Sequence, residues 1–165
     1  MTNKMGNILI LSKIEQLKNI QNGLLWIGTN FNKKINLLNS SEFFSQEKLS
    51  NHSVAEIISH LTCWRRECIL KIKTGKGSIK DDNILNWLTN KELKLLGKNR
   101  VLSDYNNSLK EIIELLHDKD DSFLEELYFD TDFDKNFNYT FLIDGMIHHD
   151  LYHLGQLGII IKNIT

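Results

Sequence analysis

The sequence contains no proline, and its nine glycines fall mainly near the apparent ends of secondary-structure elements. Because proline breaks helices and glycine marks turns, this composition favours long uninterrupted helices over a turn-rich β fold. Cysteine is scarce as well, since Cys63 and Cys68 are the only two. They lie five residues apart in one expected helix, which disfavours a disulfide between them, so we expect both thiols to be reduced.

An excess of either charge is also absent, because 20 Lys and Arg stand against 21 Asp and Glu. The formal net charge of -1 gives no electrostatic reason to expect nucleic acid or an anionic membrane as partner, and it favours a small substrate. The longest apolar runs, such as 9–11 and 159–161, are far shorter than the roughly 18 residues that span a bilayer. The amino-terminal apolar run soon meets Lys13 and Glu15 and has no small-residue cleavage site, so we expect a cytoplasmic protein.

A length of 165 residues with 41% hydrophobic content suits one core, and we expect a single domain over residues 1–165. Apolar residues recur at helical spacing in several segments, which predicts an all-α fold. The first predicted helix covers residues 6–24, bends near the glycines of 23–28 and continues in a second piece around Phe31, Ile35 and Leu38.

Three further long helices are predicted. The first begins after Ser53, which together with Glu56 forms a capping-box pattern, and ends near Gly75. The next covers residues 102–116, opened by Ser103 or Asp104, and the last starts at Asn138 and ends near residue 163. Amphipathic helices of this kind bury their apolar stripes by packing together, so we expect a four-helix bundle whose core can hold a site.

The remaining segments carry weaker patterns. Residues 84–97, around Trp87, predict a short extra helical segment in a connection. Residues 118–138 are acidic and aromatic without a clear period, and we interpret them as a connection with one turn at 123–127 that could cover a site.

His149 and His153 complete the apolar stripe of the last predicted helix. Residues four apart lie on one face of a helix, so two imidazoles can converge on one ion. Buried imidazoles also need hydrogen-bond partners and repel one another when both are protonated, and a metal ion removes both difficulties. The alternative is a pair of core or cleft histidines satisfied by backbone or water, or a chance pair on an exposed face.

His60 strengthens the metal interpretation, because it borders the stripe of the helix after Ser53 and could supply a third nitrogen from across the bundle. His52, His117 and His148 are weaker candidates and are set aside. Three neutral imidazoles suit one divalent transition metal, and Zn, Ni, Fe and Co all remain open. Three protein ligands would leave positions for water or substrate, as in catalytic sites, where a bound water or thiol loses its proton more easily.

Other side chains give weaker evidence for a functional site. Asp144, Asp150 and Gln156 are candidates to orient a ligand imidazole. Cys63 lies one turn after His60, but a small buried hydrophobe is the default for cysteine. The carboxylates at residues 81, 82, 130, 132 and 134 lack the spacing of a calcium loop, and we interpret them as a solvated acidic surface. No catalytic residue is assigned.

Three stretches resemble the DinB-like superfamily, which includes YfiT-type metal-dependent hydrolases and thiol transferases. They are LLWIGTNF (24–31), HSVAEIISHLTCWRRE (52–67) and NYTFLIDGMIHHDLYHLGQLGIIIK (138–162), in the family's order. The resemblance implies a four-helix bundle with a metal held by one histidine of the second helix and two of the last, which match His60, His149 and His153. His148 stands where the family often has glutamine, and the family's common middle-loop proline is absent.

The resemblance further implies an enzyme that activates a low-molecular-weight thiol or water for attack on a small electrophile, and a homodimer. A non-catalytic metal-binding, stress-related or dimerisation module is the alternative. It would show a bound metal with no exchangeable coordination position, or a site blocked by a fourth protein ligand from the connection 118–138. A purely helical dimerisation protein would leave the three histidines far apart.

Overall fold

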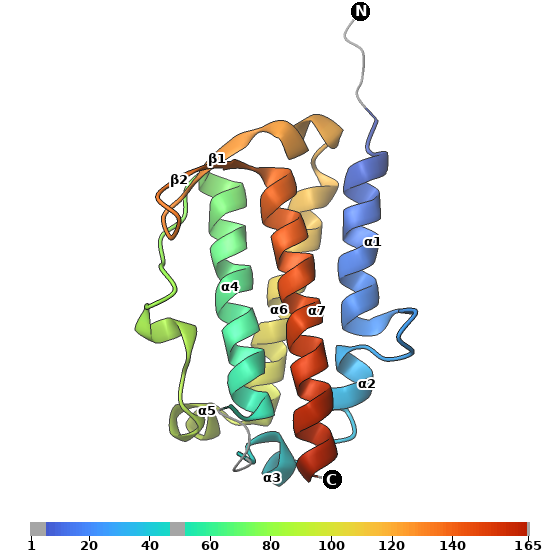
Figure 1. Cartoon of the computed structure of the whole chain (residues 1–165), viewed down its shortest axis with the longest axis vertical. Coiled ribbons are helices and arrows are strands. Elements are labelled where there is room, and N and C mark those ends of the chain that lie inside the picture. The colour runs from blue at the N-terminus through green and yellow to red at the C-terminus, as the bar shows by residue number, and fades with distance from the viewer. Residues whose placement is uncertain (1–5, 47–51, 165) are drawn as a thin grey trace, which may run out of the picture.

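The structure is a computed structural model that describes residues 6–46 and 52–164. Figure 1 shows long helices lying side by side, with shorter elements at their ends and along one flank. The elements are α1 (Ile8–Asn22), α2 (Phe31–Ile35), α3 (Ser40–Phe43), α4 (Val54–Thr74), η1 (Ile84–Asn86), α5 (Asn90–Leu96), α6 (Lys98–His117), η2 (Asp121–Glu125), β1 (Leu127–Asp130), β2 (Lys135–Asn138) and α7 (Tyr139–Ile164). The prediction of an all-α fold is confirmed, because the two strands make only a small hairpin.

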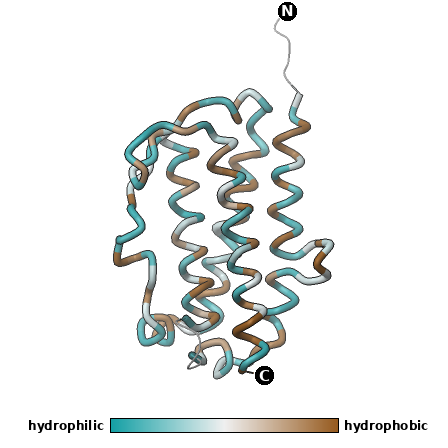
Figure 2. Tube along the Cα trace, in the orientation of Figure 1, coloured by the Kyte–Doolittle hydropathy of each residue, from teal (hydrophilic) through white to brown (hydrophobic). Residues whose placement is uncertain are grey.

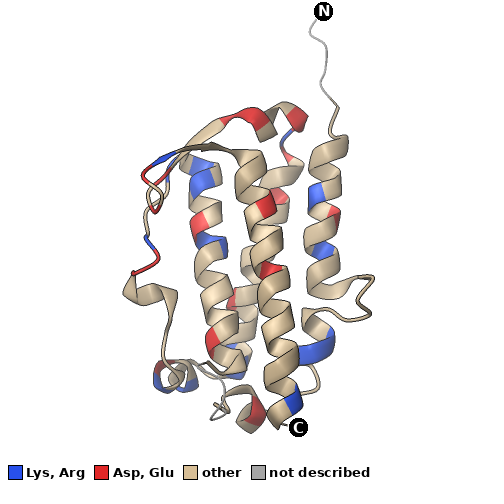
Figure 3. Cartoon of the chain, viewed as in Figure 1, with Lys and Arg blue, Asp and Glu red and all other residues tan. Residues whose placement is uncertain are grey.

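The core lies where the long helices meet. Helix α4 packs against both α6 and α7, and α1 packs against the same two helices. Hydrophobic and hydrophilic residues alternate along each helix (Figure 2), so that every helix turns an apolar face inward. Basic and acidic residues are interspersed along α1 and α4 (Figure 3), which agrees with the near-zero net charge.

Contacts within a few residues of each end determine where α4 starts and ends. Ser53 Oγ accepts a hydrogen bond from the Glu56 amide at 3.1 Å, and a Glu56 carboxylate oxygen accepts one from the Ser53 amide at 2.7 Å. Gly75 ends the helix in the left-handed region, with φ 72°. Both ends were predicted, and they fix the register that places His60 on the inner face.

Helix α6 begins at Lys98, about one turn before the predicted start at Ser103 or Asp104. Gly97 has φ 80° and separates α5 from α6 without a connecting loop. The buried Val101 extends the apolar stripe of α6 towards its amino end, which stabilises the extra turn. The weak helical segment predicted at 84–97 is present as η1 and α5.

The connection 118–138 contains a hairpin that the sequence did not predict. Strands β1 and β2 are antiparallel, with Leu127 opposite Asn138 and Asp130 opposite Lys135. The predicted turn at 123–127 lies slightly earlier, as η2. A four-residue strand shows little periodicity, and the turn uses Asp134 at φ 53° in place of glycine, so the usual hairpin signal is missing.

The carboxyl-terminal helix, α7, begins at Tyr139 directly after the predicted cap residue. The Asn138 side chain accepts a hydrogen bond from the Phe141 amide at 3.0 Å. Across the described ranges 6–46 and 52–164, none of the helices has the length and hydropathy to cross a bilayer.

Candidate metal centre

His60 from α4 and His149 and His153 from α7 lie together inside the protein. His149 Nε2 is 3.0 Å from His60 Nε2 and 3.1 Å from His153 Nε2. One ring nitrogen of each residue lies within 4.8 Å of the other two. The predicted convergence of these three residues is confirmed, and the set could hold a metal ion.

Two partners determine which nitrogens face the centre. His60 Nδ1 lies 3.2 Å from the Asn86 carbonyl oxygen, which can only accept, so Nδ1 donates and Nε2 keeps its lone pair. His153 Nδ1 lies 2.7 Å from the Gln156 side-chain oxygen and donates in the same way. Gln156 is thus the predicted residue that orients a ligand ring.

This arrangement suits a cation. Two imidazoles present lone pairs to His149 Nε2, and a neutral His149 can donate a proton to only one of them. A shared cation satisfies all three lone pairs at once, and the three nitrogens already lie within 4.8 Å of one another.

The surroundings keep the three rings neutral. Burial lowers the pKa of His60 to about 4, with repulsion from His153 as the next cause. Burial, together with repulsion from His153 and His60, lowers the pKa of His149 to about 3. The pKa of His153 is lowered as well, chiefly by burial. Neutral imidazole is the form that binds metals, so the donors are ready at neutral pH.

Residues 27–157, which include all three histidines, match the DinB superfamily. The chain belongs to this superfamily. None of the curated proteins matches the chain, and neither does any solved structure.

Asn86 supports the three histidines and was not predicted from the sequence. Besides its backbone contact with His60, its side chain accepts a hydrogen bond from Trp64 Nε1 at 2.8 Å and donates to Asp81. The residue is buried at the end of η1. An asparagine in a weak helical segment gives no sequence signal, because its role depends on how the loop folds back onto α4.

Trp87 covers the His60 ring. The two rings are stacked with centroids 3.9 Å apart, and His52 stacks on the opposite face of Trp87 at 3.8 Å. A stacked indole restricts the rotation of His60 and shields it from water. His52 was set aside as a ligand, and the structure places it behind Trp87 and outside the triad.

A buried ion pair lies next to the triad. Arg65 and Asp150 are both almost fully buried, and the Arg65 guanidinium donates to Asp150 at 2.6 Å. Arg65 also donates to Gln21 and Tyr105, which ties α4 to α1 and α6. Asp150 therefore anchors α7 beside His149 and does not bond a ligand ring.

The other sequence candidates lie away from the triad. Asp144 pairs with Lys13 on α1. His117 and His148 are exposed, and Cys63 is a free thiol that lines a separate, smaller pocket. The prediction of a solvated acidic surface is wrong for Asp130, which is 3% exposed because it pairs with the buried Lys71.

The triad opens onto a cavity of about 1060 Å³ between α4, α7 and the hairpin. Aromatic rings line it near the metal centre, among them Trp64, Trp87 and Tyr152, whereas Trp26 is fully exposed on the surface. From the hairpin, Tyr128, Asp130 and Phe133 line the cavity, so the connection 118–138 forms part of its wall. A cavity of this size fits a small molecule.

Proposed function

We propose that this DinB superfamily protein is a metal-dependent enzyme that uses one divalent transition metal (Zn, Ni, Fe or Co) held by His60, His149 and His153. The reaction is the activation of a low-molecular-weight thiol or water for transfer to, or hydrolysis of, a small electrophile. One observation carries the proposal: three neutral, hydrogen-bonded imidazoles point their free nitrogens at one place in the wall of a large cavity.

A divalent ion at this place would lower the pKa of a coordinated thiol or water and so supply a nucleophile near neutral pH. The protein's own residues would bind the ion and orient the ligand rings. Asn86 and Gln156 fix the tautomers of His60 and His153, and Trp87 holds the His60 ring. The aromatic walls exclude bulk water and offer apolar surface to a substrate.

The alternative, a metal-binding module without catalysis, would have a fourth protein ligand that blocks the site. Within residues 6–46 and 52–164, the carboxylate and thiol groups add no fourth member to the histidine set. The hairpin carboxylate Asp130, which reaches the same cavity, already accepts from Lys71. These observations favour the enzyme over the module.

The direct test is elemental analysis of protein purified without a metal-binding tag. We expect about one divalent metal per chain and conjugation of a thiol to a generic electrophile. His149→Ala should abolish both. The matched control is His148→Ala, which removes the exposed neighbouring imidazole and should retain both. Full activity in metal-free protein would refute the proposal.

Assembly is a separate part of the proposal. We propose a homodimer, in line with the family resemblance, and sedimentation of the purified chain tests it. A monomer at all concentrations would contradict the dimer while leaving the metal centre untouched.

A further inference from the structure

The cavity has a second polar end, formed by Lys71 of α4 with Asp130 and Tyr128 of the hairpin. His60 and Lys71 both line the cavity, and they lie 11 positions apart on α4, which corresponds to about 16 Å along the helix axis. Between the two ends the wall combines the apolar groups of Trp64, Leu142 and Met146 with the Arg65–Asp150 pair, whose charges are already matched to each other. The cavity is therefore long, with a different chemistry at each end.

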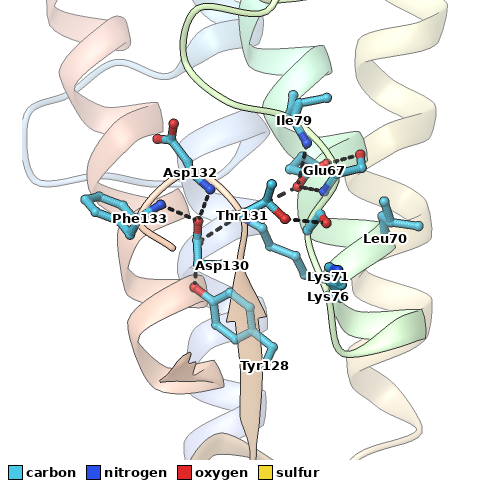
Figure 4. Close-up of polar contacts among 12 residues, drawn as sticks. Glu67, Leu70, Lys71, Lys76, Ile79, Tyr128, Asp130, Thr131, Asp132 and Phe133 are labelled. Carbon is cyan, nitrogen blue, oxygen red and sulfur yellow. Dashed lines mark hydrogen bonds and ion pairs between the residues drawn. The ribbon is translucent and has the colours of Figure 1, made fainter. Parts of the chain in front are cut away.

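Polar contacts hold the second end in place (Figure 4). Asp130 accepts from Lys71 Nζ at 2.9 Å, from the Tyr128 hydroxyl at 3.3 Å and from the amides of Asp132 and Phe133 at 3.0 and 3.3 Å. Although burial opposes it, the hydrogen bond and charge of Lys71 hold the pKa of Asp130 below its usual value. With four donors around it, this carboxylate has no acceptor capacity left for a ligand.

Lys71, unlike Asp130, has hydrogen-bonding capacity left. An ammonium group has three N–H donors, and within the described parts of the chain Lys71 Nζ makes one hydrogen bond, to Asp130. The Glu67 carboxylate lies 3.9 Å away and is occupied by Ser78 and Ile79. Lys71 is only 3% exposed, so its remaining donors are withdrawn from bulk water in the wall of the cavity. Its other neighbours, the Glu67 carboxylate at 3.9 Å and the Trp64 and Tyr128 rings at 6.0 and 5.6 Å, are too far away for a hydrogen bond. The ammonium group therefore keeps donor capacity for an acceptor on a ligand.

The local charge selects the kind of acceptor. Lys71 contributes one positive charge, whereas Asp130 and Glu67 contribute two negative charges within 4 Å of it. A ligand carboxylate or phosphate would add a further negative charge to a buried group that is already net negative. A neutral oxygen, such as an amide carbonyl or a hydroxyl, takes the same donors without this repulsion.

We infer that Lys71 is a specificity-determining residue which binds a neutral carbonyl or hydroxyl oxygen at the far end of an elongated, largely apolar substrate. The inference deepens the proposed function and rests on it, because the reacting group of the substrate is taken to lie at the histidine triad. The substrate class is thus a thiol or electrophile with an apolar middle and an uncharged polar tail.

The first experiment does not depend on the metal. Binding of hexanamide and hexanoate to the full chain is measured by NMR chemical shifts, with and without zinc. We expect hexanamide to bind more tightly than hexanoate and to shift the signals of Trp64 and Tyr128. In a Lys71→Met, Asp130→Asn variant, which removes both charges of the pair together, hexanamide should bind about tenfold more weakly.

Asp130→Asn alone is the matched control, because it keeps Lys71 and removes one negative charge. The preference should then shift towards hexanoate by about tenfold, since a unit charge within a few ångströms is worth more than one kcal/mol in a protein interior. The dispersion of the amide NMR signals of each variant reports that the fold is intact. A wild-type preference for hexanoate, or equal hexanamide binding in the wild type and the double variant, would overturn the inference.

The second experiment separates this inference from the proposed function. Zinc-loaded protein is titrated with ω-mercaptoalkanamides of increasing chain length. Affinity should rise with length until the amide reaches Lys71, and this rise should vanish in the double variant. If the shortest thiol does not bind zinc-loaded protein, the thiol reaction is wrong. If it binds and length has no effect, the role of Lys71 is wrong.

Discussion

At one end of the cavity three neutral imidazoles turn their nitrogens towards one another, whereas at the other end Lys71 lies beside two carboxylates. At the charged end, carboxylates of the chain itself balance the positive charge of Lys71. The histidine end has only lone pairs at its centre and needs a cation to hold them together. Metal removal and acid should therefore act on the triad, and substitution of ionic partners should act on the buried pairs.

The largest effect is expected where an ion pair has no contact with water. Asp150→Ala leaves the Arg65 guanidinium buried without its carboxylate, which should lower the free energy of unfolding by about 3–5 kcal/mol. Chemical denaturation of metal-free protein measures the change without a contribution from metal binding.

The same helix provides the control for this prediction. Asp144 pairs with Lys13, and both side chains are partly exposed. Asp144→Ala should cost less than about 1 kcal/mol, because solvent screens the pair. Equal losses from Asp144→Ala and Asp150→Ala would contradict the distinction between buried and screened pairs.

Acid should destabilise the metal-free protein through the triad. The pKa values of His60 and His149 are lowered to about 4 and about 3, while an unfolded histidine titrates near 6.5. As the pH falls below about 6.5, these two imidazoles bind protons in the unfolded chain but not in the folded chain. The free energy of unfolding should decrease as the pH is lowered from about 6.5 to about 4, and the loss is complete only below the folded pKa values.

Urea unfolding of chelator-treated protein at several pH values measures this slope. His149→Leu should make the slope shallower, because one lowered pKa is removed. His148→Ala is the matched variant, because it removes a neighbouring imidazole that is exposed in the folded protein. A slope of the same size in His149→Leu and the wild type would disprove the role of the triad.

The support from Asn86 should appear in metal affinity. Asn86→Ala removes the side-chain bonds to Trp64 and Asp81 that hold the carbonyl opposite His60. We expect metal affinity to fall by about 10- to 100-fold, as for other partners of ligand histidines. Asn83→Ala is the control, because Asn83 caps the same η1 turn without a contact to His60. A chelator competition titration compares the two variants.

Whether a feature of the fold or of the site could be predicted depends on how far apart in the sequence its interacting residues lie. The capping box of Ser53 and Glu56 and the spacing of His149 and His153 lie within four residues, so the sequence displays them directly. The hairpin, the Asn86 carbonyl and the Lys71 pair depend on segments that meet only after folding, up to 59 residues apart for Lys71 and Asp130. Asp130 looked like a solvated acid because its partner lies on another element.

The smallest effect is expected for Gln156, which orients His153 from the same helix. Its side-chain oxygen accepts from His153 Nδ1 at 2.7 Å, and its nitrogen donates to the exposed Tyr152 hydroxyl at 2.9 Å. Gln156 is half-buried, so water can replace its oxygen in Gln156→Leu, and metal affinity should fall by less than about tenfold. The same chelator titration measures it, with Tyr152→Phe as the control. A loss larger than that of Asn86→Ala would show that α7, and not the η1 loop, sets the geometry of the triad.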